Sequence, residues 1–179
     1  METTPLREAH LEEAAALFAR AYKEQRALTP DLPSRHEQPE HLLARLKWLL
    51  DHHPGVAAVE GGRLVGYLSG IALEEFKGEH PGVYCPEWAH AARGEDRRGI
   101  YQQMYNHLSR SWVADGRYNQ AITILAGDAE ARDLWFWNGF GLLVVDAVRP
   151  LNRIEDGVAP AGFTIKAAGR DDLDAILDL

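Results

Sequence analysis

The hydrophobic pattern of this chain changes its period at the Pro54-Gly55 pair, and this change constrains the fold more than any other feature of the sequence. Before the pair, apolar residues recur at helical spacing in two segments, 11–25 and 39–52. After it, the segments 56–60 and 63–72 have the apolar and β-branched character of strands. The two glycines between them favour a tight hairpin, because glycine accepts positive φ. The pattern therefore predicts helices packed against a sheet.

The rest of the chain repeats this alternation of strand and helix. A brief first strand is expected around residues 3–7. Residues 83–89 are expected to pair with the hairpin, although Pro86 implies an edge or a bulge there. The later predicted elements are a helix, a buried strand, a helix capped by Asp128 and a last strand, over 100–114, 121–126, 128–138 and 142–148. This order predicts an α/β (α+β) fold, with a mixed, mostly antiparallel twisted sheet and helices on both faces.

Charge and cysteine content limit the class of protein. The 179 residues carry 19 basic and 27 acidic side chains, a formal net charge of −8, which argues against a general binder of nucleic acid or of anionic membranes. No apolar run approaches the roughly 18–20 residues needed to span a bilayer, and the first twenty residues lack the pattern of a secretory signal. The single cysteine, Cys85, cannot form an intramolecular disulfide, so a cytoplasmic location is expected. No metal is expected, because the histidines have no recognisable ligand spacing.

The end of the chain repeats its beginning. At an offset of 159 residues, Leu6-Arg7-Glu8-Ala9 aligns with Ile165-Lys166-Ala167-Ala168, and acidic and apolar positions beyond them also match. The segment before the repeat has the glycine, proline and acidic content of a linker. We therefore predict a first domain at 1–152, a linker at 153–162, and the opening strand and helix of a truncated second copy at 163–179.

Two local motifs and the order of elements resemble the GNAT acyltransferase superfamily over most of residues 3–150. The first motif is Arg97-Arg98-Gly99-Ile100-Tyr101-Gln102-Gln103-Met104, and the second runs from Asp128 to Phe140. The resemblance implies a GNAT-like fold, acetyl-CoA as the acyl donor and an amine as the acceptor. The protein partner that it implies is a second GNAT domain or a second copy in a homodimer.

The resemblance places a cofactor site at the start of the helix predicted over 100–114. In the family, a loop of the form Arg/Gln-x-x-Gly-x-Gly/Ala grips the pyrophosphate of acetyl-CoA with backbone N–H groups, and a helix N-terminus offers such donors on physical grounds as well. The residues implied to hold the cofactor are Ala91, Arg97, Arg98, Gly99, Ile100, Tyr101 and Asp128. This sequence departs from the loop at two positions, because Asp96 replaces the first Arg or Gln and Tyr101 replaces the second small residue.

Two side chains near the end of the fourth predicted strand are candidates for catalysis. Glu87 and His90 are three residues apart, and either group could take a proton from an amine substrate. Odd spacing puts them on opposite faces of a regular strand, so only one is expected to face the cleft. Glu74 and Glu75, at the end of the preceding strand, are weaker alternatives.

The late helix carries a tryptophan where the family commonly has a proton-donating tyrosine. Trp135 cannot be that acid, because an indole N–H does not titrate near neutral pH, and we expect Trp135, Phe136 and Trp137 to pack in the core. The predicted function is acyl-CoA-dependent N-acyl transfer, with an acetyl group passing to an amine by direct attack. The alternative is a degenerate, non-catalytic GNAT module that acts as structural or regulatory partner of an active second domain. Asp96, Tyr101 and Trp135 favour this alternative.

Overall fold

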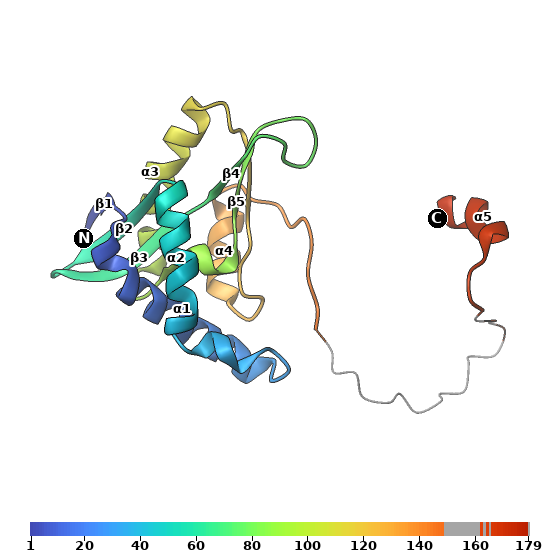
Figure 1. Cartoon of the computed structure of the whole chain (residues 1–179), viewed down its shortest axis with the longest axis horizontal. Helices are drawn as coiled ribbons and strands as arrows, with labels where there is room; N and C mark the ends of the chain where they lie inside the picture. The colour runs from blue at the N-terminus through green and yellow to red at the C-terminus, as the bar shows by residue number, and fades with distance from the viewer. Residues whose placement is uncertain (149–161, 163, 165, 179) are drawn as a thin grey trace. The chain divides into compact units, whose positions relative to one another are not determined.

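A computed structural model describes residues 1–148, 162, 164 and 166–178 of the chain. The chain divides into two compact units, Met1–Val148 and Arg149–Leu179 (Figure 1). The predicted linker at 153–162 lies outside the described residues except for Gly162.

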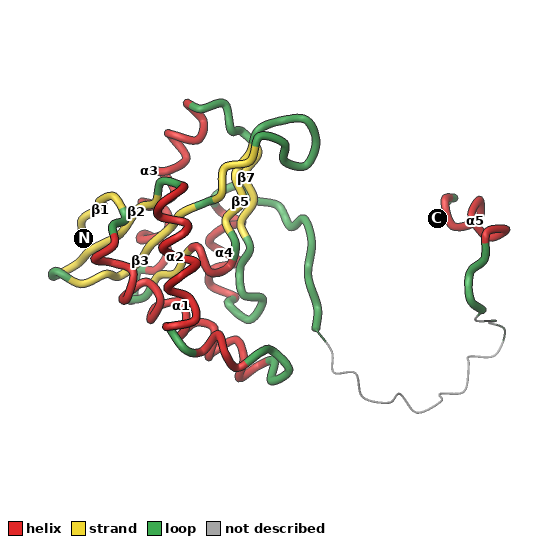
Figure 2. The backbone as a smooth tube through the Cα atoms, in the orientation of Figure 1, coloured by secondary structure: helices red, strands yellow, loops and turns green. Residues whose placement is uncertain are grey.

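The first unit alternates strands and helices in the predicted order as far as the helix predicted over 128–138 (Figure 2). Short 3-10 turns join several of them, η1 (Glu8–His10), η2 (Ser34–Glu37) and η3 (Glu87–Ala89). The strands and helices are β1 (Glu2–Pro5), α1 (Leu11–Leu28), α2 (Glu40–His52), β2 (Gly55–Glu60), β3 (Arg63–Ser69), β4 (Ile71–Leu73), β5 (Gly82–Cys85), β6 (His90–Ala92), α3 (Arg97–Ala114), β7 (Asn119–Ile122) and α4 (Ala129–Trp137).

The strands form two sheets, of order β1-β2-β3-β6 and β4-β5-β7. Gly70 separates β3 from β4, and Pro86 with η3 separates β5 from β6, so the same two stretches of chain contribute to both sheets. The β5–β7 pair is parallel, and the other described pairs are antiparallel. The mixed, mostly antiparallel arrangement predicted from the sequence is therefore confirmed.

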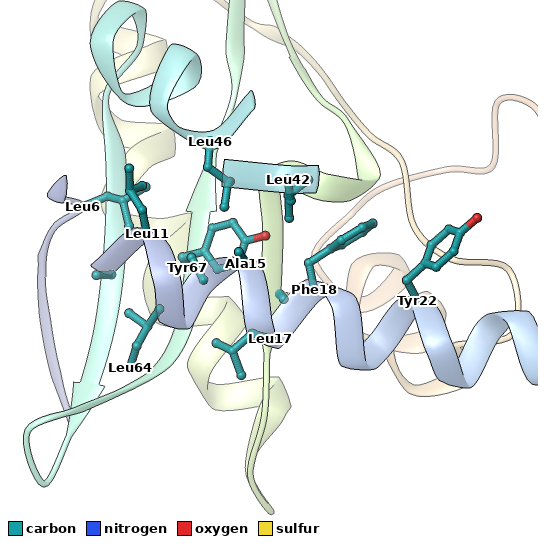
Figure 3. Close-up of a cluster of buried hydrophobic side chains, with 13 residues drawn as sticks. Leu6, Leu11, Ala15, Leu17, Phe18, Tyr22, Leu42, Leu46, Leu64 and Tyr67 are labelled. Carbon is teal, nitrogen blue, oxygen red and sulfur yellow. The ribbon is translucent and has the colours of Figure 1, made fainter. Parts of the chain in front are cut away.

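Helices cover both faces of the sheet. Successive residues of β2 and β3 point alternately into two cores, one on each face. Ala57 and Tyr67 pack with α1 and α2, as Figure 3 shows for Tyr67 beside Leu11 and Leu46. Their neighbours Val56, Ala58 and Leu68 point into a second cluster with α3 and α4, which contains Met104, Leu108 and Trp135. Successive strand residues face opposite sides, so an apolar residue at every position is what a sheet covered on both faces requires.

Two predicted strands differ in the structure. The strand predicted at 121–126 is β7, which starts earlier, ends at Ile122 and is only half-buried. The last strand predicted at 142–148 is wrong, because these residues pair with no strand in the described part of the chain. Leu142 is 83% exposed and Val145 is 64% exposed. β-branched residues favour a strand only where a neighbouring strand and a core are present to accept them.

Gly70 is needed because the break between β3 and β4 lies against the second core. A Cβ at this position would lie 2.9 Å from Cys85 Sγ and would also collide with Val83. We expect Gly70→Ala to lower the free energy of unfolding by about 1–2 kcal/mol, as overpacking of a core does. Gly141→Ala is the matched control, since nothing lies within 4 Å of a Cβ there. Urea unfolding of both variants checks this, and equal stabilities would contradict it.

In the second unit, a 3-10 turn, η4 (Arg170–Asp172), leads directly into a short helix, α5 (Leu173–Leu177). The same local order occurs at the start of the chain, where η1 leads into α1. The duplication itself stays a prediction. Among the described helices of both units, none combines the length and the hydropathy that crossing a bilayer requires.

Candidate functional site

The candidate site lies where β6 and the chain after β7 diverge. β5 and β7 run parallel as far as the Cys85–Ile122 pair, and the Thr123 amide still donates to the Cys85 carbonyl at 2.8 Å. Beyond this point Pro86 and η3 redirect the chain, and β6 pairs with β3 instead. A small cavity of about 20 Å³ remains between β6, the start of α3 and the start of α4.

Six of the nine residues predicted for the site line this cavity, namely Glu87, His90, Ala91, Arg97, Tyr101 and Asp128. The expectation that Glu87 and His90 face opposite sides is wrong, because the 3-10 turn at 87–89 interrupts the strand and brings both to the cavity. The other three predicted residues lie elsewhere. Ile100 is buried in the second core, the Arg98 guanidinium lies 5.8 Å from the centre of the Trp137 ring, and Gly99 lies in the first turn of α3.

Both ring nitrogens of His90 are engaged in hydrogen bonds. The Thr123 carbonyl can only accept, so Nε2–H of His90 donates to it at 2.8 Å. Burial lowers the pKa of His90 to about 4, so at neutral pH the ring is uncharged and Nδ1 must be an acceptor. The Tyr101 hydroxyl, 3.1 Å away, donates to Nδ1. In this arrangement His90 has no lone pair left to take a proton from a substrate.

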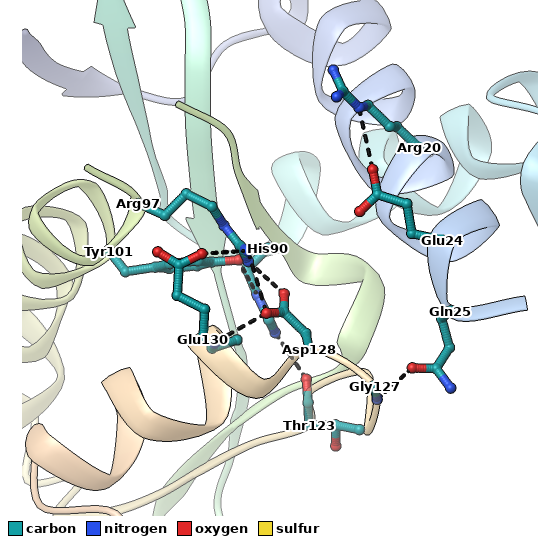
Figure 4. Close-up of polar contacts among 11 residues, drawn as sticks. Arg20, Glu24, Gln25, His90, Arg97, Tyr101, Thr123, Gly127, Asp128 and Glu130 are labelled. Atoms are coloured by element: carbon teal, nitrogen blue, oxygen red, sulfur yellow. Dashed lines mark hydrogen bonds and ion pairs between the residues drawn. The ribbon is translucent and has the colours of Figure 1, made fainter. Parts of the chain in front are cut away.

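Arg97 is held by two carboxylates at the start of α4, the N-cap Asp128 and Glu130 in the first turn, as Figure 4 shows. Its guanidinium binds both carboxylate oxygens of Asp128, with Nη1 to Oδ1 at 3.3 Å, and Nη1 also donates to Glu130 at 2.9 Å. Asp128 has a second task as the N-cap of α4, since Oδ1 accepts from the Ala131 amide at 3.0 Å. The Arg97–Asp128 pair therefore links the N-termini of α3 and α4 across the cavity.

The N-terminus of α3 is capped by the protein's own carboxylate. Asp96 Oδ1 accepts from the Gly99 amide at 2.9 Å. A Cβ on Gly99 would lie 2.8 Å from Asp96 Cγ, so the missing side chain of Gly99 makes room for this carboxylate. The sequence predicted that Gly99 admits a phosphate. In the structure an anion does approach it closely, but that anion is Asp96.

The residues present do not fit acetyl-CoA in the way that the family resemblance implies. The Gly99 amide, which a pyrophosphate would need, already has a carboxylate as its acceptor. Arg97, at the first position of α3, is neutralised by Asp128 and Glu130. Tyr101 is buried, and its ring fills the position where the family has a small residue. A pyrophosphate would have to displace the Asp96 carboxylate before it could accept from the Gly99 amide.

The aromatic residues of α4 divide between core and surface. Trp135 is buried as predicted, and its ring packs edge-to-face against Tyr101, Tyr105 and Phe140. The prediction that Phe136 and Trp137 are also core residues is wrong, since they are 69% and 72% exposed. A nine-residue helix on one face of a sheet cannot bury three consecutive side chains, because they point in directions about 100° apart.

Several contacts that shape the site had little or no signal in the sequence. The Asp96 cap could have been found, because Asp followed by a helix start is a capping pattern. The Thr123 carbonyl could not, because any residue supplies a carbonyl. The same holds for Gln25 of α1, whose side-chain oxygen accepts from the Gly127 amide at 2.6 Å and holds the loop before α4.

No protein-family model matches the sequence, and no curated protein matches it. Solved structures match in fold. An aminoglycoside acetyltransferase, HMB0005, from an uncultured soil metagenomic sample is 23% identical with a TM-score of 0.57, over 84% of this chain and 98% of its own. A GCN5-related N-acetyltransferase from Ralstonia eutropha JMP134 is 15% identical with a TM-score of 0.60, over 84% and 97%. The aminoglycoside N-acetyltransferase AAC(6')-Iy, solved in complex with CoA, is 17% identical with a TM-score of 0.57, over 84% and 95%. The chain therefore has the GNAT fold that its element order and motifs predicted.

Proposed function

We propose that the domain at residues 1–152 is a GNAT-fold module that does not catalyse acyl transfer and acts as structural or regulatory partner of a second GNAT-like domain, predicted to begin at Phe163. The observation that carries this proposal is the Asp96 carboxylate on the Gly99 amide. A carboxylate of the protein itself occupies the amide to which the family resemblance assigns a pyrophosphate. The domain then has the fold of an enzyme but a structural or regulatory role, as the departures at Asp96, Tyr101 and Trp135 suggested.

The local charge supports this proposal. Three arginines surround the start of α3, Arg93, Arg97 and Arg98, but four carboxylates accompany them, Glu95, Asp96, Asp128 and Glu130. A pyrophosphate would therefore enter a region whose formal charge is already negative. Sites that hold phosphate groups at a helix N-terminus combine free amides with an excess of positive charge, whereas here the Gly99 amide is capped by Asp96 and the formal charge is not positive.

Calorimetric titration with acetyl-CoA, and separately with free CoA, tests the proposal. We expect no heat of binding up to millimolar ligand from the folded wild-type chain. The variant Asp96→Gln with Tyr101→Ala, which removes the competing anion and the bulky ring, is expected to bind at least tenfold more tightly than the wild type. Circular dichroism and urea unfolding establish that each variant is folded. Micromolar binding by the wild type would overturn the proposal.

A second candidate function is acyl-CoA-dependent N-acyl transfer to an amine, with Glu87 as the base. One observation favours it: the cavity gathers six of the predicted site residues, and the Glu87 carboxylate there makes no hydrogen bond or ion pair within the described residues. Glu87 could accept the proton of an attacking amine, whereas His90 could not. This candidate requires micromolar binding of acetyl-CoA that Arg98→Glu abolishes, followed by turnover with an amine that Glu87→Gln reduces at least a hundredfold.

A further inference from the structure

The end of α2 carries a cluster of three aromatic rings. Trp48 and His52 lie one turn apart on the helix, and their rings stack with centroids 4.9 Å apart. The ring of His53, the C-cap residue, lies 5.5 Å from that of Trp48 at an angle of 66°. His52 is fixed to its own helix, because its Nδ1–H donates to the Trp48 carbonyl at 2.7 Å. Of the two histidines His52 is exposed and His53 is half-buried, so His53 is the imidazole in contact with the rest of the fold.

His53 joins this helix end to the second sheet. Its Nδ1 accepts from the Ala72 amide of β4 at 3.4 Å, a long hydrogen bond. β4 is the end strand of its sheet, and no described strand lies along its outer side. Within the described residues, this is the only side-chain hydrogen bond between α2 with its C-cap and that sheet. The His53 ring therefore covers a backbone amide that an edge strand otherwise leaves unpaired.

This contact requires a neutral imidazole. An amide N–H can only donate, so Nδ1 of His53 must keep its lone pair, and the ring proton then lies on Nε2. Burial lowers the pKa of His53, and the charges of His52 and Arg117 lower it further. At neutral pH the ring is therefore uncharged and the bond to Ala72 is present.

Arg117 cannot retreat from a positive charge on His53. Its Nη1 donates to the Leu73 carbonyl at 2.7 Å, and its Nη2 pairs with the Glu74 carboxylate at 2.6 Å. The side chain is only 16% exposed. The charged groups that act on His53 are thus His52 on its own helix and Arg117 before β7, and the nearby carboxylate of Glu74 is engaged by Arg117. A protonated Nδ1 would point its N–H at the Ala72 N–H, close to this fixed cation.

We propose that His53 is an acid-sensitive latch between the end of α2 and the outer edge of β4. When the ring binds a proton, it leaves the Ala72 amide, the end of α2 separates from the second sheet, and the edge of β4 opens to solvent. Open edges can pair with further strands, so acid converts a covered edge into an exposed one. This inference does not depend on the proposed function, because it involves neither the cavity nor a ligand.

The direction of the pH dependence follows from the same contacts. The folded pKa of His53 lies below its ordinary value of 6.5, so the folded chain binds this proton less readily than the unfolded chain does. The stability that the latch contributes is fully present above pH 6.5. It is lost as the pH falls from 6.5 to the folded pKa, so the latch opens on the acid side.

NMR spectroscopy of the full chain tests the latch at the two groups that it joins. We expect the ring signals of His53 to titrate with a midpoint below 6.5, and the Ala72 amide resonance to move with the same midpoint. Between about pH 7.5 and pH 5, hydrogen-exchange protection of the Ala72 amide should fall by about threefold or more relative to the amides of the β2–β3 hairpin. This ratio separates local opening from acid destabilisation of the whole fold.

Two variants assign the effect to His53. His53→Gln offers an oxygen acceptor to Ala72 but cannot titrate, so its protection ratio should no longer depend on pH. His52→Gln is the matched control, because it removes the adjacent imidazole, which bonds to its own helix. There Ala72 should still respond, with a higher midpoint because one neighbouring charge is gone. A wild-type Ala72 amide that does not respond to pH, or one that responds equally in His53→Gln, would refute the latch. A His53 midpoint at or above 6.5 would refute it as well, because the ring would then have no preference for the neutral form.

Discussion

Asp128→Ala should lower the free energy of unfolding by about 3 kcal/mol. This effect should be larger than that of Asp128→Asn, which keeps one of the two interactions that alanine removes. Two losses combine. The α4 N-cap is worth about 1 kcal/mol, and removing one member of a mostly buried ion pair leaves the Arg97 charge poorly compensated. Glu130 remains as a partner, which keeps the cost below that of a fully buried pair.

Asp128→Asn separates the two losses. Asparagine caps helices about as well as aspartate, so this variant keeps the cap and loses the charge, with an expected cost of about 2 kcal/mol. Adding Arg97→Met removes the uncompensated charge and should recover at least 1 kcal/mol relative to Asp128→Asn alone. Urea unfolding of the wild type, Asp128→Asn, Arg97→Met alone and the double variant forms a double-mutant cycle. Additive effects in this cycle would show that the pair does not stabilise the junction of α3 and α4.

The same pair illustrates what a sequence can reveal about a site. Asp128 as the cap of α4 could be predicted, because capping is a local rule that relates a residue to the amides just after it. Its second role, as the partner of Arg97, could not, because the two residues are 31 positions apart and no local pattern relates them. Arg97 was predicted to hold phosphate from the family motif, and a contact between two helices gave it a different environment.

The prediction of strands has the same limit, because a local pattern does not reveal a partner that is distant in the sequence. The hairpin at Gly61-Gly62 was predictable, since both glycines have positive φ, as the turn between adjacent strands requires. The segment 142–148 has equally strong strand propensity and is not a strand, because a strand exists only with a partner along its edge. Sequence indicates whether a segment is suited to a sheet. Whether a neighbour is available depends on the topology of the whole molecule, or on a second molecule.

His90 should make the fold sensitive to acid, by about 3 kcal/mol between pH 7 and pH 4. Burial lowers the pKa of His90 to about 4 from its ordinary value of 6.5. As the pH falls below 6.5 the unfolded chain binds a proton on this ring while the folded chain does not, so protons favour unfolding. The stability that His90 contributes is fully present above pH 6.5 and is lost progressively as the pH falls to about 4, where the folded ring also becomes charged.

Comparison of variants isolates this effect from other groups that titrate in the same range. Burial also lowers the pKa of His36 and His53, and they remain in every variant. His90→Gln keeps a donor and an acceptor in the buried position but cannot titrate, so its loss of stability from pH 7 to pH 4 should be about 3 kcal/mol smaller than that of the wild type. His107→Gln, at an exposed position of α3, should lose as much as the wild type. Urea unfolding at half-unit pH steps measures all three proteins. Parallel curves for the wild type and His90→Gln would mean that the imidazole becomes protonated in the folded state near its ordinary pKa, and that its bond to the Thr123 carbonyl does not require the neutral ring.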